Sequence, residues 1–402
     1  MFIARQPIFN QKLKVYGYEL LFRLDEKSEN YDGVSSTGAT ATVISGLFEC
    51  GVDCIVEDKY AFVNFDEKFI YSDSVELIGS DRLIIEMLED INVDELLIER
   101  LRELKEKGYK IALDDFVEDY KKYPLVPIAN IIKYDLLLTP LNTIKAEVKT
   151  ALSQNKILLA EKIETMDTFK EAKEMGFHLF QGFFFSKPSI KRKTYDRTVT
   201  KAQYFRILYE LRKEEPSFTI LAEMIRQDVN LAYRLMRAIN VRSGYNSVNS
   251  IKNALTFMGL KEIERWINIL MLQDFGKSKP KELMRLSLIR TKFAEAISLH
   301  GEFHNLKHEA SMMGLFSVMD AMLDQPMKEA LEDTALPDSV LDALINNKGI
   351  LSPIYDLFIA YEKGDFLQAK EISREIKVEE SILYDEYLKS IQWARDVLRA
   401  ID

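Results

Sequence analysis

The first half of this 402-residue chain alternates short apolar runs with longer amphipathic segments. The run at 109–116 contains Ile-Ala-Leu shortly after a glycine, which is typical of a parallel strand buried on both faces. The segment 93–107 carries apolar residues at helical spacing among many charges, which predicts an amphipathic helix. Two strand-like runs at 3–9 and 15–23, joined by a short polar turn, predict an antiparallel pair at the start of the chain.

The same patterns recur along the first 190 residues. Further strands are predicted at 60–65, 83–86, 130–135, 156–161 and 178–185, and further helices at 38–48 and 169–175. Strands that alternate with helices pair in parallel through right-handed crossovers. Six or more such units predict a closed, TIM-like β/α barrel, whose chemistry lies at the carboxyl ends of its strands.

Almost all of the second half is predicted to be helical, so the fold class expected for the chain is α/β plus all-α. Apolar residues at helical spacing cover 202–211, 220–226, 230–241, 251–257, 260–272, 282–298 and 309–323. The basic segment between the halves predicts a solvated linker rather than a phosphate site. The expected boundaries are a barrel over 1–190, a basic linker and helix start over 191–205, and an all-helical domain over 206–402.

The composition, 47% hydrophobic and 29% charged, is that of a soluble globular protein. A net charge of −10 argues against non-specific binding to nucleic acid polymers or to anionic membranes. The first residues lack the features of a signal peptide, and no apolar run is long enough to span a bilayer. Cys50 and Cys54 lack the partners of a zinc site, so they are expected to be free thiols of a cytoplasmic protein.

Polar side chains stand at the end of one predicted strand after another. Asp114 and Asp115 end the strand at 109–116, where two carboxylates tolerate proximity if both are solvated or a divalent cation lies between them. Taken alone, the pair could be structural, with Asp115 capping a following helix and Asp114 in water. In a barrel these side chains would instead converge on one mouth. The set expected there is Glu19, Asn64, Glu86, Asp114, Asp115, Lys133, Glu161 and Gln181.

This set of side chains indicates a class of chemistry. Oxygen ligands without histidine or cysteine favour magnesium or manganese over zinc. Two such ions a few ångströms apart suit phosphodiester hydrolysis, because they generate a hydroxide and neutralise the charge that develops on the phosphate. A lysine such as Lys133 can orient the water or stabilise that charge.

In their order along the chain, these residues resemble the EAL domain, the family of cyclic di-GMP phosphodiesterases, over about residues 1–190. The family's opening Gln-Pro-Ile matches Gln6-Pro7-Ile8, and its Glu-Ala-Leu-x-Arg signature appears as Glu19-Leu20-Leu21-Phe22-Arg23. The family's Ala-Glu-Gly-Val-Glu motif appears as Ala160-Glu161-Lys162-Ile163-Glu164, with Lys162 in place of the glycine. The remaining matches are Asn64, Glu86, Asp114-Asp115-Phe116, Lys133 and Gln181-Gly182-Phe183-Phe184-Phe185. The resemblance implies a modified barrel with an antiparallel first strand, in agreement with the pair predicted at the start of the chain.

The resemblance also implies a role for each matching residue. One metal ion would be held by Glu19, Asn64, Glu86 and Asp114, and a second by Asp114, Asp115 and Glu161. The catalytic residues would be Glu19, Glu161 and Lys133, of which Lys133 would act on the attacking water. The nucleotide would be contacted by Gln6, Arg23 and Gln181, and Glu164 would anchor the loop that follows Asp114-Asp115-Phe116.

Two departures from the family pattern fall near these residues. Leu20 stands in place of the alanine of the signature, which is a packing change. Val117, Glu118 and Asp119 stand in place of Gly-Thr/Ser-Gly, a loop that the family couples to dimerisation and metal binding. Losing both glycines removes backbone freedom at positions where the family can use a positive φ. Asp115 and Lys133 are 18 positions apart, about two fewer than the family pattern, so the loop is expected to be rebuilt.

Residues from about 200 to 390 resemble the HDOD domain, a relative of the HD phosphohydrolases that keeps their helical fold. The matching segments are 230–240, 251–255 and 258–260. An HD hydrolase needs a His-Asp dipeptide as a metal ligand, and none of the 4 histidines precedes an aspartate. The second domain is therefore interpreted as a non-catalytic module for regulation or partner binding.

Two hypotheses of different class follow. In the first, the protein is an enzyme that cleaves cyclic di-GMP to linear pGpG with two magnesium or manganese ions. In the second, the altered loop blocks turnover, and the protein is a cyclic di-GMP receptor or a signalling scaffold. A barrel enzyme for a different phosphodiester would leave Gln6, Arg23 and Gln181 unexplained. The expected partners are cyclic di-GMP, a second copy of the chain through the barrel, and an unidentified protein at the HDOD domain.

Overall fold

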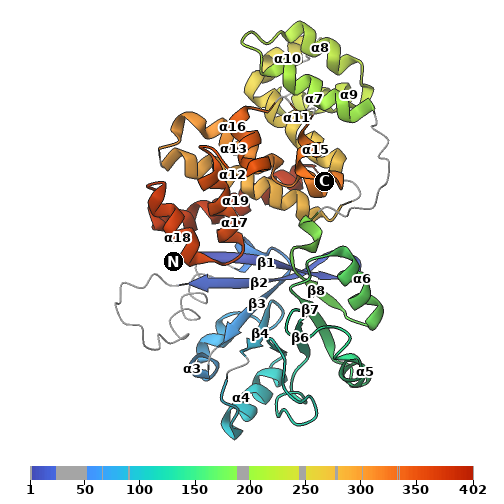
Figure 1. Cartoon of the computed structure of the whole chain (residues 1–402), viewed down its shortest axis with the longest axis vertical. Coiled ribbons are helices and arrows are strands. Elements are labelled where there is room, and N and C mark those ends of the chain that lie inside the picture. The colour runs from blue at the N-terminus through green and yellow to red at the C-terminus, as the bar shows by residue number, and fades with distance from the viewer. Residues whose placement is uncertain are drawn as a thin grey trace.

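The structure is a computed structural model of the chain (Figure 1). It describes residues 2–23, 52–65, 67–88, 91–187, 199–243, 250–276, 279–300, 302–332, 334 and 336–401. The predicted helix at 38–48, Cys50 and the part of the predicted linker at 191–198 lie outside the described residues.

Eight strands close into a barrel in the order of the chain (Figure 1). They are β1 (Phe2–Asn10), β2 (Val15–Arg23), β3 (Tyr60–Phe65), β4 (Leu83–Met87), β5 (Lys110–Leu113), β6 (Ile131–Asp135), β7 (Ile157–Glu161) and β8 (Leu179–Gln181). Strand β1 runs antiparallel to both of its neighbours, β2 and β8, and each of the other neighbouring pairs is parallel. The predicted barrel with an antiparallel first strand is confirmed.

Short helices pack around the strands (Figure 1). They are α2 (Val52–Val56), α3 (Glu67–Ile70), α4 (Glu95–Glu106), α5 (Lys145–Ser153) and α6 (Met166–Met175), with 3-10 helices η1 (Asp73–Leu77) and η2 (Phe183–Ser186). Helix α4 illustrates the local rules, because Asp94 caps its first turn by accepting a hydrogen bond from the Leu97 backbone N–H at 2.8 Å. The buried Leu97, Leu101 and Leu104 then recur at helical spacing on the face toward the strands.

The interior of the barrel holds two layers of side chains. The lower, apolar layer consists of Ile8, Phe62, Ile84, Ala112, Ile131, Leu159 and Leu179. Side chains alternate along a strand, so residues two positions nearer the mouth also point inward. These residues, Gln6, Asn64, Glu86, Asp114, Lys133, Glu161 and Gln181, form a polar ring together with Glu19 of β2. Gly17 lies two residues below Glu19, and any Cβ there would lie 2.6 Å from the ring of Phe62.

Strand β8 is shorter than the predicted strand at 178–185. It ends at Gln181, because Gly182 has a φ of 141°, and 3-10 helix η2 follows directly. At Gly182 the backbone passes close to the backbone of Ile163. The Ile163 N–H donates to the Gln181 carbonyl, and the Ile163 carbonyl accepts from the Phe184 N–H. The apolar run was predicted as one strand because its four phenylalanines suit either structure.

Two further predictions of local structure are wrong. In the described segment 91–187, the first helix after Asp115 is α5, so Asp115 does not cap a helix directly after it. The chain makes turns there instead. The buried Phe116 holds them to the barrel through a hydrogen bond from its backbone N–H to the Lys133 carbonyl. The predicted helix at 309–323 is split at Ser317 and Val318 into α13 (Lys307–Phe316) and α14 (Met319–Leu323). The Ser317 hydroxyl bonds to the Gly314 carbonyl at 2.7 Å and also accepts from Arg290, which favours ending α13 there.

The second half is all-helical, as predicted (Figure 1). Its helices are α7 (Val199–Leu211), α8 (Phe218–Arg226), α9 (Val229–Ser243), α10 (Ile251–Met258), α11 (Leu260–Phe275), α12 (Lys281–His300), α13 and α14, α15 (Met327–Leu331), α16 (Asp338–Asn346), α17 (Ser352–Glu362), α18 (Phe366–Glu375) and α19 (Glu380–Ile401), with 3-10 helix η4 (His304–Leu306). Among the described residues, no helix combines the length and the apolar character needed to cross a membrane.

The helices α12 to α19 form the part of the helical region next to the barrel, with α17 and α19 against it, whereas α7 to α11 lie farther away (Figure 1). Helices α17 and α19 contact β1, and α19 also contacts α2. Polar bonds join the two regions: the Tyr18 hydroxyl donates to Glu282 at 3.0 Å, and the Gln6 side chain donates to the Lys363 carbonyl at 3.4 Å. The helical region therefore covers the β1–β2 side of the barrel and reaches the level of the polar ring.

We expect Gly182→Ala to lower the free energy of unfolding of the barrel by more than about 2 kcal/mol. An added Cβ would lie 2.2 Å from the Ile163 carbonyl oxygen, a backbone atom that cannot turn aside, and alanine rarely adopts a φ of 141°. Calorimetric unfolding of both proteins measures the difference.

Gly108→Ala is the matched control. Gly108 also has a positive φ, 96°, in the same barrel, but its added Cβ would meet only the Ser80 side chain, at 3.0 Å. Gly108→Ala should lower the free energy of unfolding by about 1 kcal/mol, from backbone strain alone. Equal losses for the two variants would contradict the close backbone approach at Gly182.

Candidate active site

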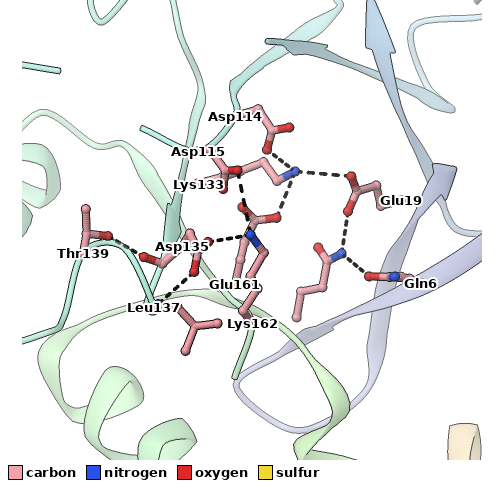
Figure 2. Close-up of polar contacts among 11 residues, drawn as sticks. Gln6, Glu19, Asp114, Asp115, Lys133, Asp135, Leu137, Thr139, Glu161 and Lys162 are labelled. Carbon is pink, nitrogen blue, oxygen red and sulfur yellow. Dashed lines mark hydrogen bonds and ion pairs between the residues drawn. The ribbon is translucent and has the colours of Figure 1, made fainter. Parts of the chain in front are cut away.

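The strands bring most of the predicted site residues together at one end of the barrel. Figure 2 shows six of them: Gln6, Glu19, Asp114, Asp115, Lys133 and Glu161. The polar ring contains Gln6 from β1, Glu19 from β2, Asn64 from β3, Glu86 from β4, Lys133 from β6, Glu161 from β7 and Gln181 from β8, with Asp114 directly after β5. Asp115 lies beside the ring, one residue further along the chain. Residues far apart in sequence therefore meet because each occupies the same level of its strand.

Lys133 stands at the centre of the ring (Figure 2). Its ammonium nitrogen lies 2.6 Å from an Asp114 oxygen, 2.7 Å from Glu86 and 3.0 Å from Glu161. A fourth carboxylate, that of Glu19, is 3.8 Å away. The Lys133 side chain is completely buried, so these carboxylates take the place of water around its charge.

Burial and charge act in opposite directions on these groups. Burial alone would lower the pKa of Lys133, but the surrounding carboxylates outweigh it and hold the pKa well above its usual value. Burial raises the pKa of Glu86 well above its ordinary range, in spite of the Lys133 charge. The pKa of Glu161 is raised to about 8, mainly by burial and further by the Asp114 and Glu19 charges. Burial therefore disfavours the negative charge of both Glu86 and Glu161.

The two glutamines join the ring from β1 and β8. The Gln181 amide nitrogen donates to the Gln6 side-chain oxygen at 3.1 Å and also to the Glu19 carboxylate. These bonds hold the Gln181 amide between Gln6 and Glu19 and tie the antiparallel strand β1 to the rest of the ring.

A second ammonium group lies outside the ring. Lys162 contacts the buried Asp135 at 2.5 Å and lies 4.0 Å from Asp115 (Figure 2). Both Lys162 and Asp115 have positive φ, 51° and 36°, a region that favours glycine. Burial, followed by the Asp114 charge, raises the pKa of Asp115. Sequence reasoning noted Lys162 only within a motif and gave Asp135 no role, although the glycine expected of the family at Lys162 was a signal for this conformation.

The donor set fits divalent cations. Carboxylate oxygens of Asp114, Asp115 and Glu161 lie within 4.8 Å of one another. Together with Glu19 and Glu86, these acids bring five carboxylates to a site with two ammonium groups, those of Lys133 and Lys162. Carboxylates in excess of cationic side chains, without sulfur or imidazole, are ligands suited to magnesium or manganese.

Two of the predicted site residues have no described contact with the polar ring. The side chain of Arg23 lies outside the described residues, although its backbone ends β2. Glu164 forms an ion pair with Lys187 at 3.1 Å, and both side chains are exposed. Its role as the anchor of the loop after Asp115 stays a prediction.

The ring opens into a cavity of about 750 Å³ that lies between the two halves of the chain. The barrel contributes Gln6, Glu19, Asp114, Asp115, Glu161, Lys162 and Gln181 to its wall, among others. The helical region contributes Arg290, Ser317, Asp320, Met327, Leu344, Tyr355, Ile359, Glu362 and Lys363. Sequence reasoning missed this second wall, because no local pattern shows which face of a helix meets a distant barrel.

Two protein families match this chain, one within the barrel and one within the helical region. An EAL domain matches residues 74–188, and an HDOD domain matches residues 200–332. The EAL match begins after β3, yet the structure places Gln6, Glu19 and Asn64, which precede the match, in the same ring as the matched acids.

Two curated proteins are similar to this chain over its whole length. Uncharacterized protein YuxH of Bacillus subtilis is 33% identical, with 100% of this chain and 99% of that protein covered. Cyclic di-GMP phosphodiesterase CdgJ of Vibrio cholerae is 31% identical, with 100% of this chain and 94% of that protein covered. Among solved structures, the Bacillus subtilis YkuI protein, with an EAL domain, is 20% identical over 68% of this chain and 72% of its own, but a TM-score of 0.39 is too low to support an argument.

The two domain matches, and the full-length identity to both relatives, show that the chain belongs to the family of proteins in which an EAL domain is followed by an HDOD domain.

Proposed function

We propose that this protein is a phosphodiesterase that hydrolyses cyclic di-GMP to linear pGpG with two Mg²⁺ or Mn²⁺ ions at the mouth of the barrel. The observation that carries the proposal is the group of carboxylates that the strands gather around Lys133 beside a cavity of nucleotide size. A relative that is 31% identical over the whole chain is named as a cyclic di-GMP phosphodiesterase, which supports this substrate.

The acids of the ring are the proposed ligands of the cations. One ion would be held by Glu19, Asn64, Glu86 and Asp114, and the other by Asp114, Asp115 and Glu161. Bound there, the ions would supply a hydroxide at neutral pH and neutralise the charge that develops on the phosphate. The closeness of the Asp114, Asp115 and Glu161 oxygens supports the second assignment.

The protein's own side chains would position the reacting groups. The positive charge of Lys133, fixed by three short carboxylate contacts, would act on the attacking water and stabilise negative charge on the phosphate. The water oxygen would bond to phosphorus, the bond from phosphorus to the 3′ oxygen would break, and that oxygen would take up a proton. Gln6, Gln181 and Arg23 would contact the nucleotide.

We also propose a division of labour along the chain. Residues 1–190 would be the catalytic barrel, 191–205 a basic linker and helix start, and 206–402 a regulatory HDOD domain without metal chemistry of its own. A protein partner of the helical region and a dimer through the barrel remain part of the proposal, with a cytoplasmic location.

A cyclic di-GMP receptor without turnover is the second candidate. It is favoured by the Lys162 ammonium, which lies near Asp115, and by a loop without the family's glycines after Asp115. In that case the same ring would bind the nucleotide, and the helical region would respond to it.

The Asp114→Asn and Glu19→Ala variants should each lower formation of pGpG by at least about a hundredfold, because each removes a proposed metal ligand from the ring. Purified protein is incubated with cyclic di-GMP and Mg²⁺, then with Mn²⁺, and the products are separated by chromatography. Asp119→Asn is the control, since Asp119 is an exposed acid on the following loop that pairs with Lys122.

The outcomes separate the two candidates. Metal-dependent pGpG from the wild type and the control, but not from the ring variants, supports the enzyme. Absence of product with either metal, together with calorimetric binding of cyclic di-GMP in Ca²⁺, would instead identify a receptor; absence of both would leave a scaffold.

Lys162→Gly should tighten Mn²⁺ binding about fivefold, which corresponds to roughly 1 kcal/mol. The substitution removes an ammonium group 4.0 Å from Asp115 and places glycine at a φ of 51°. Titration calorimetry with Mn²⁺ alone measures the affinity without any substrate.

Lys187→Ala is the matched control for Lys162. Lys187 lines the same cavity at similar exposure, but its ammonium group pairs with Glu164 rather than with a proposed ligand. Its loss should leave Mn²⁺ affinity almost unchanged. A similar gain in both variants would show only a general effect of removing positive charge.

A further inference from the structure

The helical region forms one wall of the cavity into which the polar ring opens. This wall comes from α12, from Ser317 between α13 and α14, and from α14 to α17. The hydrogen bond from the Gln6 side chain to the Lys363 carbonyl, at 3.4 Å, joins the two walls directly beside the ring. A ligand that fills the cavity therefore touches both domains.

A buried ion pair lies in this second wall. The Arg290 guanidinium donates to Glu362 through Nε at 2.9 Å and through Nη2 at 2.7 Å, and to the Ser317 hydroxyl through Nη1 at 3.1 Å. Arg290 and Glu362 are each less than a tenth exposed. A guanidinium has five N–H groups, so these bonds leave one on each terminal nitrogen for another acceptor.

Asp320 lies near this pair on the same wall. One of its carboxylate oxygens accepts the Ala321 backbone N–H at 2.7 Å, and its side chain lines the cavity. Arg290 bonds to the Ser317 hydroxyl, three residues before Asp320 in the chain, and all three side chains line the same cavity. The second carboxylate oxygen adds acceptor capacity toward the cavity.

Apolar and aromatic side chains surround these polar groups. Met327, Leu344, Tyr355 and Ile359 line the same part of the cavity. A flat ring system would be enclosed by such side chains, while a few fixed polar groups at its edge would determine which ring is accepted. The wall thus combines the two components of a nucleobase site.

Guanine is the base that matches this set of groups. Its N1–H and N2 amino group donate hydrogen bonds to a carboxylate, and its O6 and N7 accept them from arginine. Adenine has an acceptor in place of the N1–H and a donor in place of O6, so it would face a carboxylate and an arginine with the wrong polarity.

We propose that the helical region contains a guanine subsite. In this subsite, Asp320 and Arg290 bind the edge of the guanine base that lies farther from the metal-binding acids. The subsite deepens the proposed function and rests on it, because cyclic di-GMP carries a second guanine beyond the phosphate that is cleaved. The HDOD domain then contributes directly to substrate binding.

The Asp320→Asn variant tests the subsite. The substitution keeps the size of the side chain but removes its charge and an acceptor, so KM for cyclic di-GMP should rise about tenfold or more while kcat changes little. Hydrolysis of bis(p-nitrophenyl) phosphate, which has no guanine, should be unchanged. Asp356→Asn is the control, because Asp356 follows Tyr355 on α17 and is not part of the cavity wall.

A second variant guards against a change in folding. Met327→Trp fills the subsite without removing a polar group, and it should also raise KM for cyclic di-GMP alone. Unfolding temperatures equal to that of the wild type show that both variants fold. An unchanged KM for both would overturn the subsite, while turnover by the wild type would still support the phosphodiesterase.

A wild type without turnover would instead count against the phosphodiesterase, and the subsite is then judged by binding. Calorimetric titration of cyclic di-GMP in Ca²⁺ should give a weaker affinity for Asp320→Asn than for the wild type. Equal affinities, or no binding to the wild type, would overturn the subsite.

Discussion

A single buried ammonium group makes this barrel mouth possible. Four carboxylates from different strands lie within 3.8 Å of the Lys133 nitrogen. Buried carboxylates repel one another and each loses its hydration, so acids at this density need positive charge between them. Lys133 supplies part of that charge from within the fold. The remaining negative charge is what the proposed divalent cations would neutralise.

The polar ring could be predicted because polar side chains stand at the ends of successive strands. The apolar layer beneath it, seen in the structure, follows from the two-residue period of a strand. Ile84 and Glu86, or Leu159 and Glu161, place an apolar and an acidic side chain on the same inner face, one level apart. A reader of the sequence who recognises the strands can therefore place the ring without coordinates. The antiparallel β1 could be predicted from the short turn that precedes β2.

Other features depend on backbone conformation or on contacts between distant segments, which periodicity does not encode. Lys162 has a positive φ and forms an ion pair with Asp135, and the family's glycine at this position was the only hint of that conformation. The end of β8 at Gly182 depends on a neighbouring backbone, that of Ile163. The Arg290–Glu362 pair joins residues of α12 and α17 that are far apart in sequence.

The direction of β1 has a practical consequence for handling this protein. Because β1 is antiparallel to β2, Phe2 pairs with Arg23 and therefore lies on the same side of the barrel as the polar ring, beyond Gln6 and Glu19. The N-terminus in Figure 1 lies close to α17 and α18, which border that side. An affinity tag or fusion partner attached before Phe2 would emerge beside the entrance to the cavity.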